Sequence, residues 1–98
     1  FLDLTNWEME KDGVKHGLMF GADTGWMYKT LSHITLKNGN YKGINYAYTV
    51  ISGTMLKFDT ETPGFENEIE CVVSKDRKSL RLDKDVYKKV ERITWYQD

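Results

Sequence analysis

The chain has 98 residues, of which 40% are hydrophobic and 30% charged, and its formal net charge is −1. This length allows one domain with a single core, and the balance of apolar and charged residues is that of a globular protein. A net charge close to zero supplies no long-range field toward nucleic acid, so we exclude nucleic acid as a partner. No run of 18 apolar residues is present, which excludes a transmembrane helix at the level of the sequence.

The first half of the chain alternates apolar and polar residues in short runs that end at turn sequences. Trp7 and Met9 share one face of the first run, and Leu18 and Phe20 share the inward face of the second. Asp-Gly and Asn-Gly dipeptides are favoured in tight hairpins because both positions adopt positive φ. These turns separate predicted strands at residues 5–10, 14–20, 26–31 (continuing through Ile34 and Leu36) and 44–50.

The second half repeats this pattern. Ser52-Gly53 predicts a two-residue turn before a strand at residues 55–58, and Pro63-Gly64 predicts a further turn. Alternation then predicts strands at residues 66–73, 80–82 and 86–90. The spacing of Val86, Val90 and Ile93 also allows a short helix. We favour a strand at 86–90, because pairing with the first strand would remove an exposed edge, and we leave 91–98 open as irregular or helical.

About eight short strands at this spacing predict an all-β fold. We expect one domain over residues 1–98, an up-and-down antiparallel meander that closes into a small barrel. The three Trp, six Tyr and four Phe suit half-buried strands and supply core area to a small domain.

Few residues in the chain offer catalytic chemistry. Cys71 is the single cysteine, so no intramolecular disulfide or thiolate cluster can form, and its parity with Ile69 and Val73 predicts a buried position. Glu68 and Glu70 share a strand face that we expect to be solvated. The sequence therefore predicts no enzyme and no cofactor.

A metal site has weak support in the sequence. His16 and His33 are the two histidines, and Asp12 or Asp23 could complete a ligand set. No pair has the short spacing of preformed ligands, so we predict no metal.

Charge is unevenly distributed in the second half. Residues 59–70 carry five acidic side chains and no basic one, whereas residues 75–92 carry eight basic and four acidic side chains. We interpret these as solvated strand faces of opposite sign. The alternative, a phosphate-binding face, lacks interleaved exposed aromatic residues.

Several motifs occur in an order that resembles a known family. They are Thr5-Asn6-Trp7, Phe20-Gly21-Ala22-Asp23, Tyr48-Thr49-Val50-Ile51-Ser52-Gly53-Thr54-Met55-Leu56, Glu68-Ile69-Glu70, Leu80-Arg81-Leu82 and Tyr87-Lys88-Lys89. This order resembles the small lipocalin-like domains of secreted or lipid-anchored Bacteroidetes proteins. The resemblance implies a lipocalin-like barrel in the periplasm, at the cell surface or secreted, with any membrane attachment through a lipid anchor upstream of residue 1. Thr5 stands where lipocalins have glycine, and the chain lacks a long lid, which argues against a roomy cavity.

Binding is the function that the aromatic residues favour, because their rings stack on sugars and anchor protein partners. We expect a non-enzymatic extracytoplasmic domain that docks to an unknown protein or weakly binds a small ligand. The alternatives are a carrier of a small hydrophobic ligand or sugar in a barrel cavity, and a protein inhibitor of an enzyme. An aromatic wall would include Tyr41, and the candidate ligand-binding residues are Trp7, Phe20, Trp26, Tyr28, Tyr46, Tyr48 and Phe58.

Overall fold

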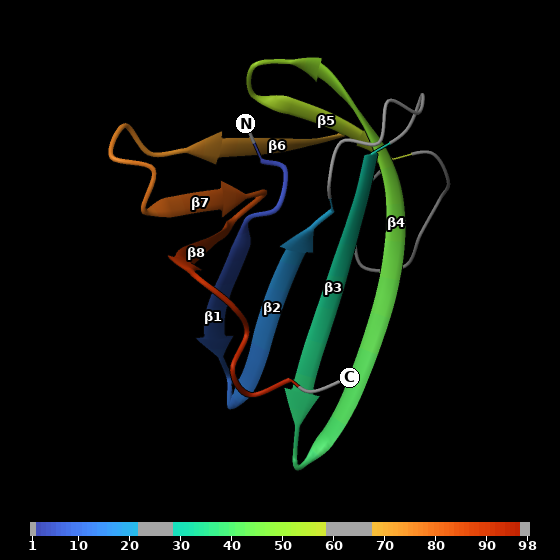
Figure 1. The fold of residues 1–98 in the computed structure, drawn as a ribbon, viewed down its shortest axis with the longest axis vertical. Helices are drawn as coiled ribbons and strands as arrows, with labels where there is room; N and C mark the ends of the chain where they lie inside the picture. The colour runs from blue at the N-terminus through green and yellow to red at the C-terminus, as the bar shows by residue number, and fades with distance from the viewer. Residues whose placement is uncertain (1, 22–28, 59–67, 97–98) are drawn as a thin grey trace.

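A computed structural model describes residues 2–21, 29–58 and 68–96 of the chain. Within these residues, eight antiparallel strands follow one another in chain order around a closed barrel (Figure 1). The all-β up-and-down barrel predicted from the alternation is therefore confirmed. The strands are β1 (Asn6–Lys11), β2 (Val14–Phe20), β3 (Lys29–Lys37), β4 (Asn40–Ser52), β5 (Met55–Phe58), β6 (Glu68–Val73), β7 (Ser79–Leu82) and β8 (Asp85–Val90).

The barrel has a long side and a short side. Strands β1 to β4 run side by side down the view of Figure 1, whereas the shorter β5 to β7 cross its upper part. β4 has 13 residues, and β5 and β7 have four each. The lower ends of β3 and β4 therefore extend past β5 to β7.

Two predicted hairpins are confirmed by their backbone angles. Asp12 and Gly13 have φ of 54° and 76°, and Asn38 and Gly39 have φ of 51° and 77°. Positive φ at both central residues is the type I′ geometry, which matches the twist of the flanking strands. These turns set the register of β1 against β2 and of β3 against β4.

The predicted Ser52-Gly53 turn is displaced by one residue. β4 continues through Ser52, which pairs with Met55, so that Gly53 and Thr54 form the turn. The register shifts between Val50 and Ser52, as at a β-bulge, which adds a residue to one strand. Val50, beside this irregularity, is 44% exposed although it shares the predicted inward parity of Tyr46 and Tyr48.

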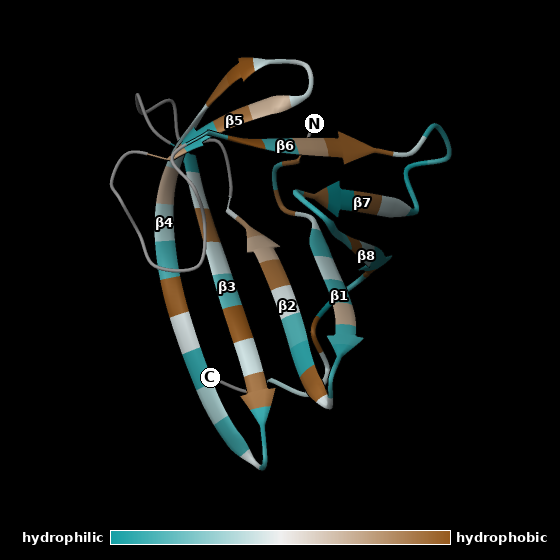
Figure 2. Cartoon of the chain, turned by 180° about the vertical axis from the view of Figure 1, so that it is seen from behind, coloured by the Kyte–Doolittle hydropathy of each residue, from teal (hydrophilic) through white to brown (hydrophobic). Residues whose placement is uncertain are grey.

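The core lies between the inward faces of the strands. Apolar and polar residues alternate along β1 to β4 in Figure 2, as one buried and one solvated face require. Leu2, ahead of β1, also joins the core, and the Leu4 amide donates to the Phe20 carbonyl. The core comprises Leu2, Trp7, Leu18, Phe20, Leu31, Tyr46, Tyr48, Leu56, Phe58, Ile69, Cys71, Leu80, Leu82 and Tyr87.

The last strand closes the barrel beside the first. β8 is a strand, as favoured, and it pairs with β1 through Asn6↔Val90, Trp7↔Lys89 and Glu8↔Lys88. Closure leaves few sheet edges for unwanted pairing.

Residues 91–96, here named the C-terminal strap, are irregular and cross the outer face of the long strands (Figure 1). Ile93 is buried, and a Cβ added to Gly17 on β2 would lie 3.2 Å from the Trp95 ring. Glycine at position 17 therefore lets the strap approach the sheet closely. The Trp95 indole N–H donates to the Glu8 carboxylate at 3.0 Å, and the Tyr41 hydroxyl donates to the Trp95 carbonyl.

Candidate functional site

The candidate ligand-binding aromatic residues lie inside the barrel where the structure describes them. Trp7, Phe20, Tyr46, Tyr48 and Phe58 all belong to the core and are at most 3% exposed. Trp26 and Tyr28 lie outside the described residues. The rings of Phe20, Tyr46, Tyr48 and Phe58 contact one another.

Their packing is edge-to-face. The Tyr46 and Phe58 ring centroids are 5.4 Å apart, and those of Phe20 and Tyr48 are 5.9 Å apart. Such pairs add favourable energy to the burial of their area. These rings therefore pack against one another in the core.

Tyr41 does not belong to this group. Its side chain lies on the outer face of β4, where it contacts Tyr96 with 5.8 Å between ring centroids. Successive residues of a strand face opposite sides, and Tyr41 has the opposite parity to Tyr46 and Tyr48. The prediction that Tyr41 shares an aromatic wall with Tyr46 and Tyr48 is therefore wrong.

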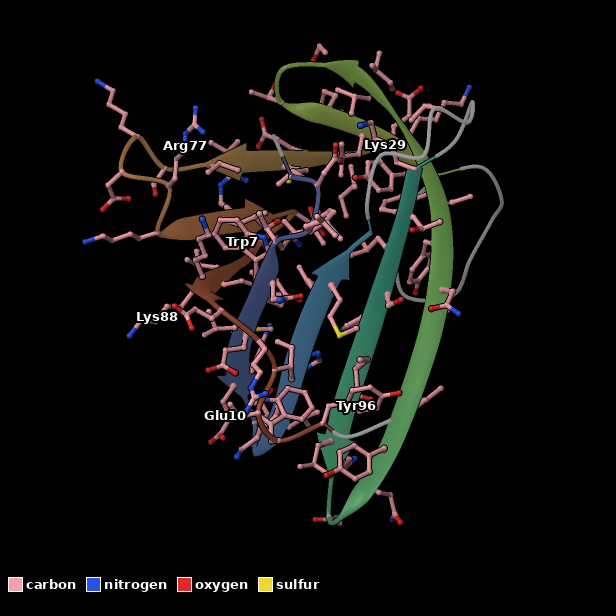
Figure 3. The ribbon with its side chains drawn as sticks, in the orientation of Figure 1. Trp7, Glu10, Lys29, Arg77, Lys88 and Tyr96 are labelled. Carbon is pink, nitrogen blue, oxygen red and sulfur yellow. The ribbon has the colours of Figure 1, made fainter. Side chains whose placement is uncertain are left out.

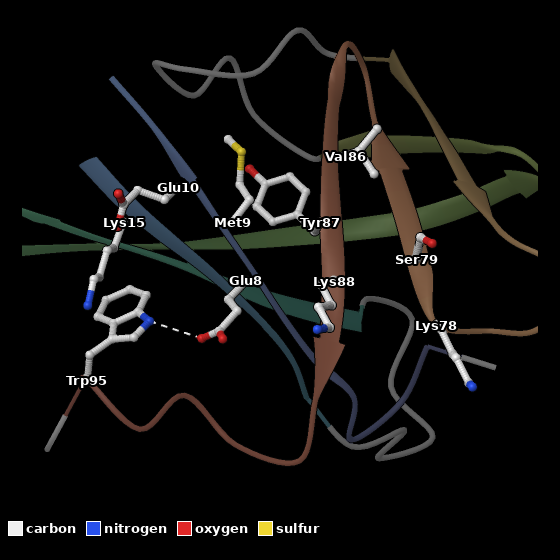
Figure 4. Close-up of a pocket in the computed structure, with 10 residues that line it drawn as sticks. All are labelled: Glu8, Met9, Glu10, Lys15, Lys78, Ser79, Val86, Tyr87, Lys88 and Trp95. Atoms are coloured by element: carbon white, nitrogen blue, oxygen red, sulfur yellow. Dashed lines mark hydrogen bonds between the residues drawn. The ribbon is translucent and has the colours of Figure 1, made fainter. Parts of the chain in front are cut away.

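A groove of about 620 Å³ opens on the outer surface where β1 meets β8 (Figure 4). The β1–β8 ladder stops at Glu8↔Lys88, and beyond it Met9 and Glu10 pair with β2 alone, while Val86 and Tyr87 pair with β7 alone. Two strand edges therefore flank the opening. We name it the seam groove, lined by Glu8, Met9, Glu10, Lys15, Lys78, Ser79, Val86, Tyr87, Lys88 and Trp95.

The floor and walls of the seam groove are largely apolar. Met9 and Tyr87 come from the inward faces of their strands and lie near each other in Figure 4. Val86 is 59% exposed beside them, and the Trp95 ring stands at the other side, held by its hydrogen bond to Glu8. The far end is spanned by an ion pair, with 3.2 Å between Lys11 Nζ and Asp85 Oδ1.

The rim of the groove is mainly basic. Lys78 and Lys88 line both the seam groove and an adjoining hollow of about 320 Å³, which Lys89 also lines. Figure 3 shows Lys88 directed away from the barrel. Of the described residues, none makes an ion pair with Lys15, Lys78 or Lys88. These ammonium groups are available to an anionic partner, although Glu8 and Glu10 add two negative charges to the lining.

The two histidines, distant in sequence, meet on the inner face of β2 and β3. His16 lies on β2 and His33 on β3, with 3.1 Å between His16 Nδ1 and His33 Nε2. Their rings stack with 5.3 Å between centroids. Burial lowers the pKa of both imidazoles, that of His33 to about 4. The negative charge of Asp85 acts against this shift at both rings. Both imidazoles are neutral at neutral pH.

The remaining candidate groups lie apart from the groove. Cys71 is buried in the core, as predicted, and burial raises its thiol pKa to about 11. Glu68 and Glu70 are exposed, and Glu70 pairs with Arg81. In the described ranges, no three His, Cys, Asp or Glu side chains are grouped to hold a metal ion.

No protein-family model, curated protein or solved structure matches the chain. The described part of the chain contains no helix long and apolar enough to cross a membrane.

Sequence reasoning missed the seam groove, although some of its signals were present. The expected pairing of the first and last strands brings the strand of Met9 beside the strand of Tyr87. Val86 has the outward parity of the last strand. On that face the next residue on either side is a lysine, so an apolar side chain stands on a basic surface. How far the ladder would extend depends on twist and closure, which no short motif encodes.

Proposed function

We propose that this chain is a non-enzymatic binding domain that docks to another protein by holding an extended segment of it in the seam groove. The observation that carries the proposal is the early end of the β1–β8 ladder, after three residue pairs. It leaves two strand edges beside an apolar floor. Extended peptides bind such edges through main-chain hydrogen bonds, while pockets beside the edge select alternate side chains.

The chemistry of the groove defines the segment it suits. Met9, Val86 and Tyr87 offer an apolar surface for one side chain of the partner. Lys15, Lys78 and Lys88 surround it with positive charge, which favours neighbouring acidic side chains. The partner is therefore an extended segment in which an apolar residue is flanked by Asp or Glu.

A carrier function has less support. The described rings of Phe20, Tyr46, Tyr48 and Phe58 pack against one another in the core, and an eight-stranded barrel is just wide enough for side chains to fill it. An inhibitor of an enzyme stays compatible with docking, because the groove would hold a segment of that enzyme. We retain from the lipocalin-like resemblance the proposal that the domain acts outside the cytoplasm, as a secreted or lipid-anchored protein.

The experiment is selection of a displayed random peptide library on the immobilised domain, followed by affinity measurement with synthetic peptides. We expect peptides with an apolar residue beside acidic ones. The Lys78→Glu, Lys88→Glu double variant should bind them at least about tenfold more weakly. Lys57→Glu, a charge reversal of an exposed lysine on β5 away from the groove, should bind them like the wild type.

Two results would overturn the proposal. Peptides that bind the double variant as tightly as the wild type would place recognition elsewhere on the domain. Saturable quenching of tryptophan fluorescence by a fatty acid at low micromolar concentration, without any selected peptide, would favour the carrier function instead.

A further inference from the structure

The histidine pair has the geometry of a metal site that the sequence spacing concealed. His33 pairs across the β2–β3 ladder with Leu18, and His16 pairs with Thr35, so the two imidazoles are diagonal neighbours on one face. Side chains in this relation are within reach of each other. Their nearest nitrogens are 3.1 Å apart.

This separation matches two nitrogens bound to one ion. Imidazole nitrogens bind Zn²⁺ at about 2.0 to 2.1 Å, so two adjacent ligands lie about 2.8 to 3.0 Å apart around an octahedral ion and about 3.3 to 3.4 Å apart around a tetrahedral one. The strands already hold the nitrogens at this spacing. Little of the binding energy is needed to bring the ligands together, in contrast to two histidines on mobile segments.

We propose that His16 Nδ1 and His33 Nε2 together bind a divalent transition-metal ion of the class that imidazole prefers. The ion takes the lone pairs of both nitrogens, and the proton that one of them donates to the other in the metal-free pair moves to the second nitrogen of its own ring. Each ring then keeps its proton on its other nitrogen, so both ligands bind as neutral tautomers. Water completes the coordination, because both rings are only partly buried.

The surroundings of the pair favour such an ion. The negative charge of Asp85 acts on both imidazoles, and Lys11, which pairs with Asp85, opposes it at His16. Among divalent ions the usual order of stability places Cu²⁺ above Ni²⁺ and Zn²⁺, whereas Ca²⁺ and Mg²⁺ prefer oxygen ligands.

The test is calorimetric titration of the tag-free domain with CuCl₂, NiCl₂, ZnCl₂ and MgCl₂ at neutral pH. We expect one equivalent of Cu²⁺ to bind more tightly than Ni²⁺ or Zn²⁺, and no heat from Mg²⁺. His16→Gln and His33→Gln should each weaken Cu²⁺ binding at least about tenfold. Cys71→Ala, which removes the one thiol but leaves both imidazoles, should bind like the wild type.

A second measurement on the wild type keeps the proposal falsifiable if the variants unfold. In NMR spectra with Zn²⁺, both imidazole ring signals should shift together and saturate at the same equivalence. Signals that stay unchanged, or Cu²⁺ binding equal in the wild type and in a folded His16→Gln, His33→Gln double variant, would overturn it. This result is independent of peptide binding in the seam groove.

Discussion

Trp7 connects the closing seam of the barrel to its core. It is 2% exposed, and its neighbours in the sheet are Leu18 on β2 and Lys89 on β8. Its indole N–H donates to Thr5 Oγ1 at 2.9 Å, so the one polar atom of the ring is satisfied. The threonine that departs from the lipocalin pattern therefore has a role in this structure.

Replacing Trp7 should be among the most destabilising changes in the chain. We expect Trp7→Ala to cost about 3 to 5 kcal/mol, because the barrel cannot collapse around the cavity of a lost indole. Urea unfolding followed by circular dichroism measures this cost. As a control, Ile51→Ala, at a residue that is 51% exposed, should change the free energy of unfolding by less than about 0.5 kcal/mol. A loss below about 1 kcal/mol for Trp7→Ala would contradict the buried position of the ring.

Thr5 allows a separate prediction about the hydrogen bond. Thr5→Val keeps the shape of the side chain but removes the acceptor for the Trp7 indole and the donor to the Leu2 carbonyl. We expect a cost of about 1 to 3 kcal/mol, because both partners are left without this contact in a partly buried place. Thermal unfolding of the two proteins measures it, and an unchanged midpoint would show that water replaces the hydroxyl.

At the scale of elements, the C-terminal strap explains a feature of β3 that alternation alone does not. Leu31 faces the core, whereas Ile34 has the opposite parity and is nevertheless buried. Ile34 pairs with Gly17, against which Ile93 and Trp95 lie. The outer face of the sheet thus has a small apolar cover of its own.

Gly17 and Gly43 form a matched pair that tests this cover. A Cβ at Gly17 would meet the Trp95 and Ile93 side chains at 3.2 to 3.3 Å, whereas a Cβ at Gly43 would meet nothing within 4 Å. We expect Gly17→Ala to loosen the strap and to cost about 1 kcal/mol or more. Gly43→Ala should be neutral or slightly stabilising, because alanine restricts the unfolded chain. Hydrogen exchange of the Trp95 indole N–H measures the loosening, and equal exchange in both variants would contradict the packing.

The fold could be predicted because each strand carries its own local signal. Asp12-Gly13 and Asn38-Gly39 place two turns correctly, and the parity of Trp7, Tyr46 and Cys71 places them in the core. The Ser52 turn was displaced because a bulge depends on the partner strand as much as on the turn residues.

The candidate site was less predictable for a related reason. His16 and His33 are 17 positions apart, and their meeting follows from the β2–β3 register rather than from any spacing along the chain. The seam groove likewise depends on where two strands at opposite ends of the sequence diverge. Contacts that form only when the whole barrel closes are therefore difficult to predict from a local sequence pattern.

At the scale of the whole molecule, the core contains groups that resist ionisation at high pH. Burial raises the pKa of the Cys71 thiol from 9.0 to about 11 and also raises the pKa of the Tyr46 and Tyr87 phenols. As pH rises past 9, the unfolded chain releases these protons first, while the folded protein retains them. The folded state then binds more protons than the unfolded state, so stability falls with pH.

The contribution of Cys71 can be isolated by its effect on this pH dependence. Between pH 8 and pH 10.5, we expect the free energy of unfolding to fall by about 2 kcal/mol because of Cys71. The unfolded chain loses the thiol proton in this range, whereas the raised pKa keeps it on the folded protein. Urea unfolding at several pH values in this range measures the slope for the wild type and for Cys71→Ala. The variant starts less stable because it leaves a small cavity, but its stability should decline less steeply, since alanine has no proton to lose. Tyr87→Phe should flatten the slope in the same sense. Parallel slopes for the wild type and Cys71→Ala would mean that the thiol ionises as readily in the folded barrel as in the unfolded chain, and would contradict the effect of burial on its pKa.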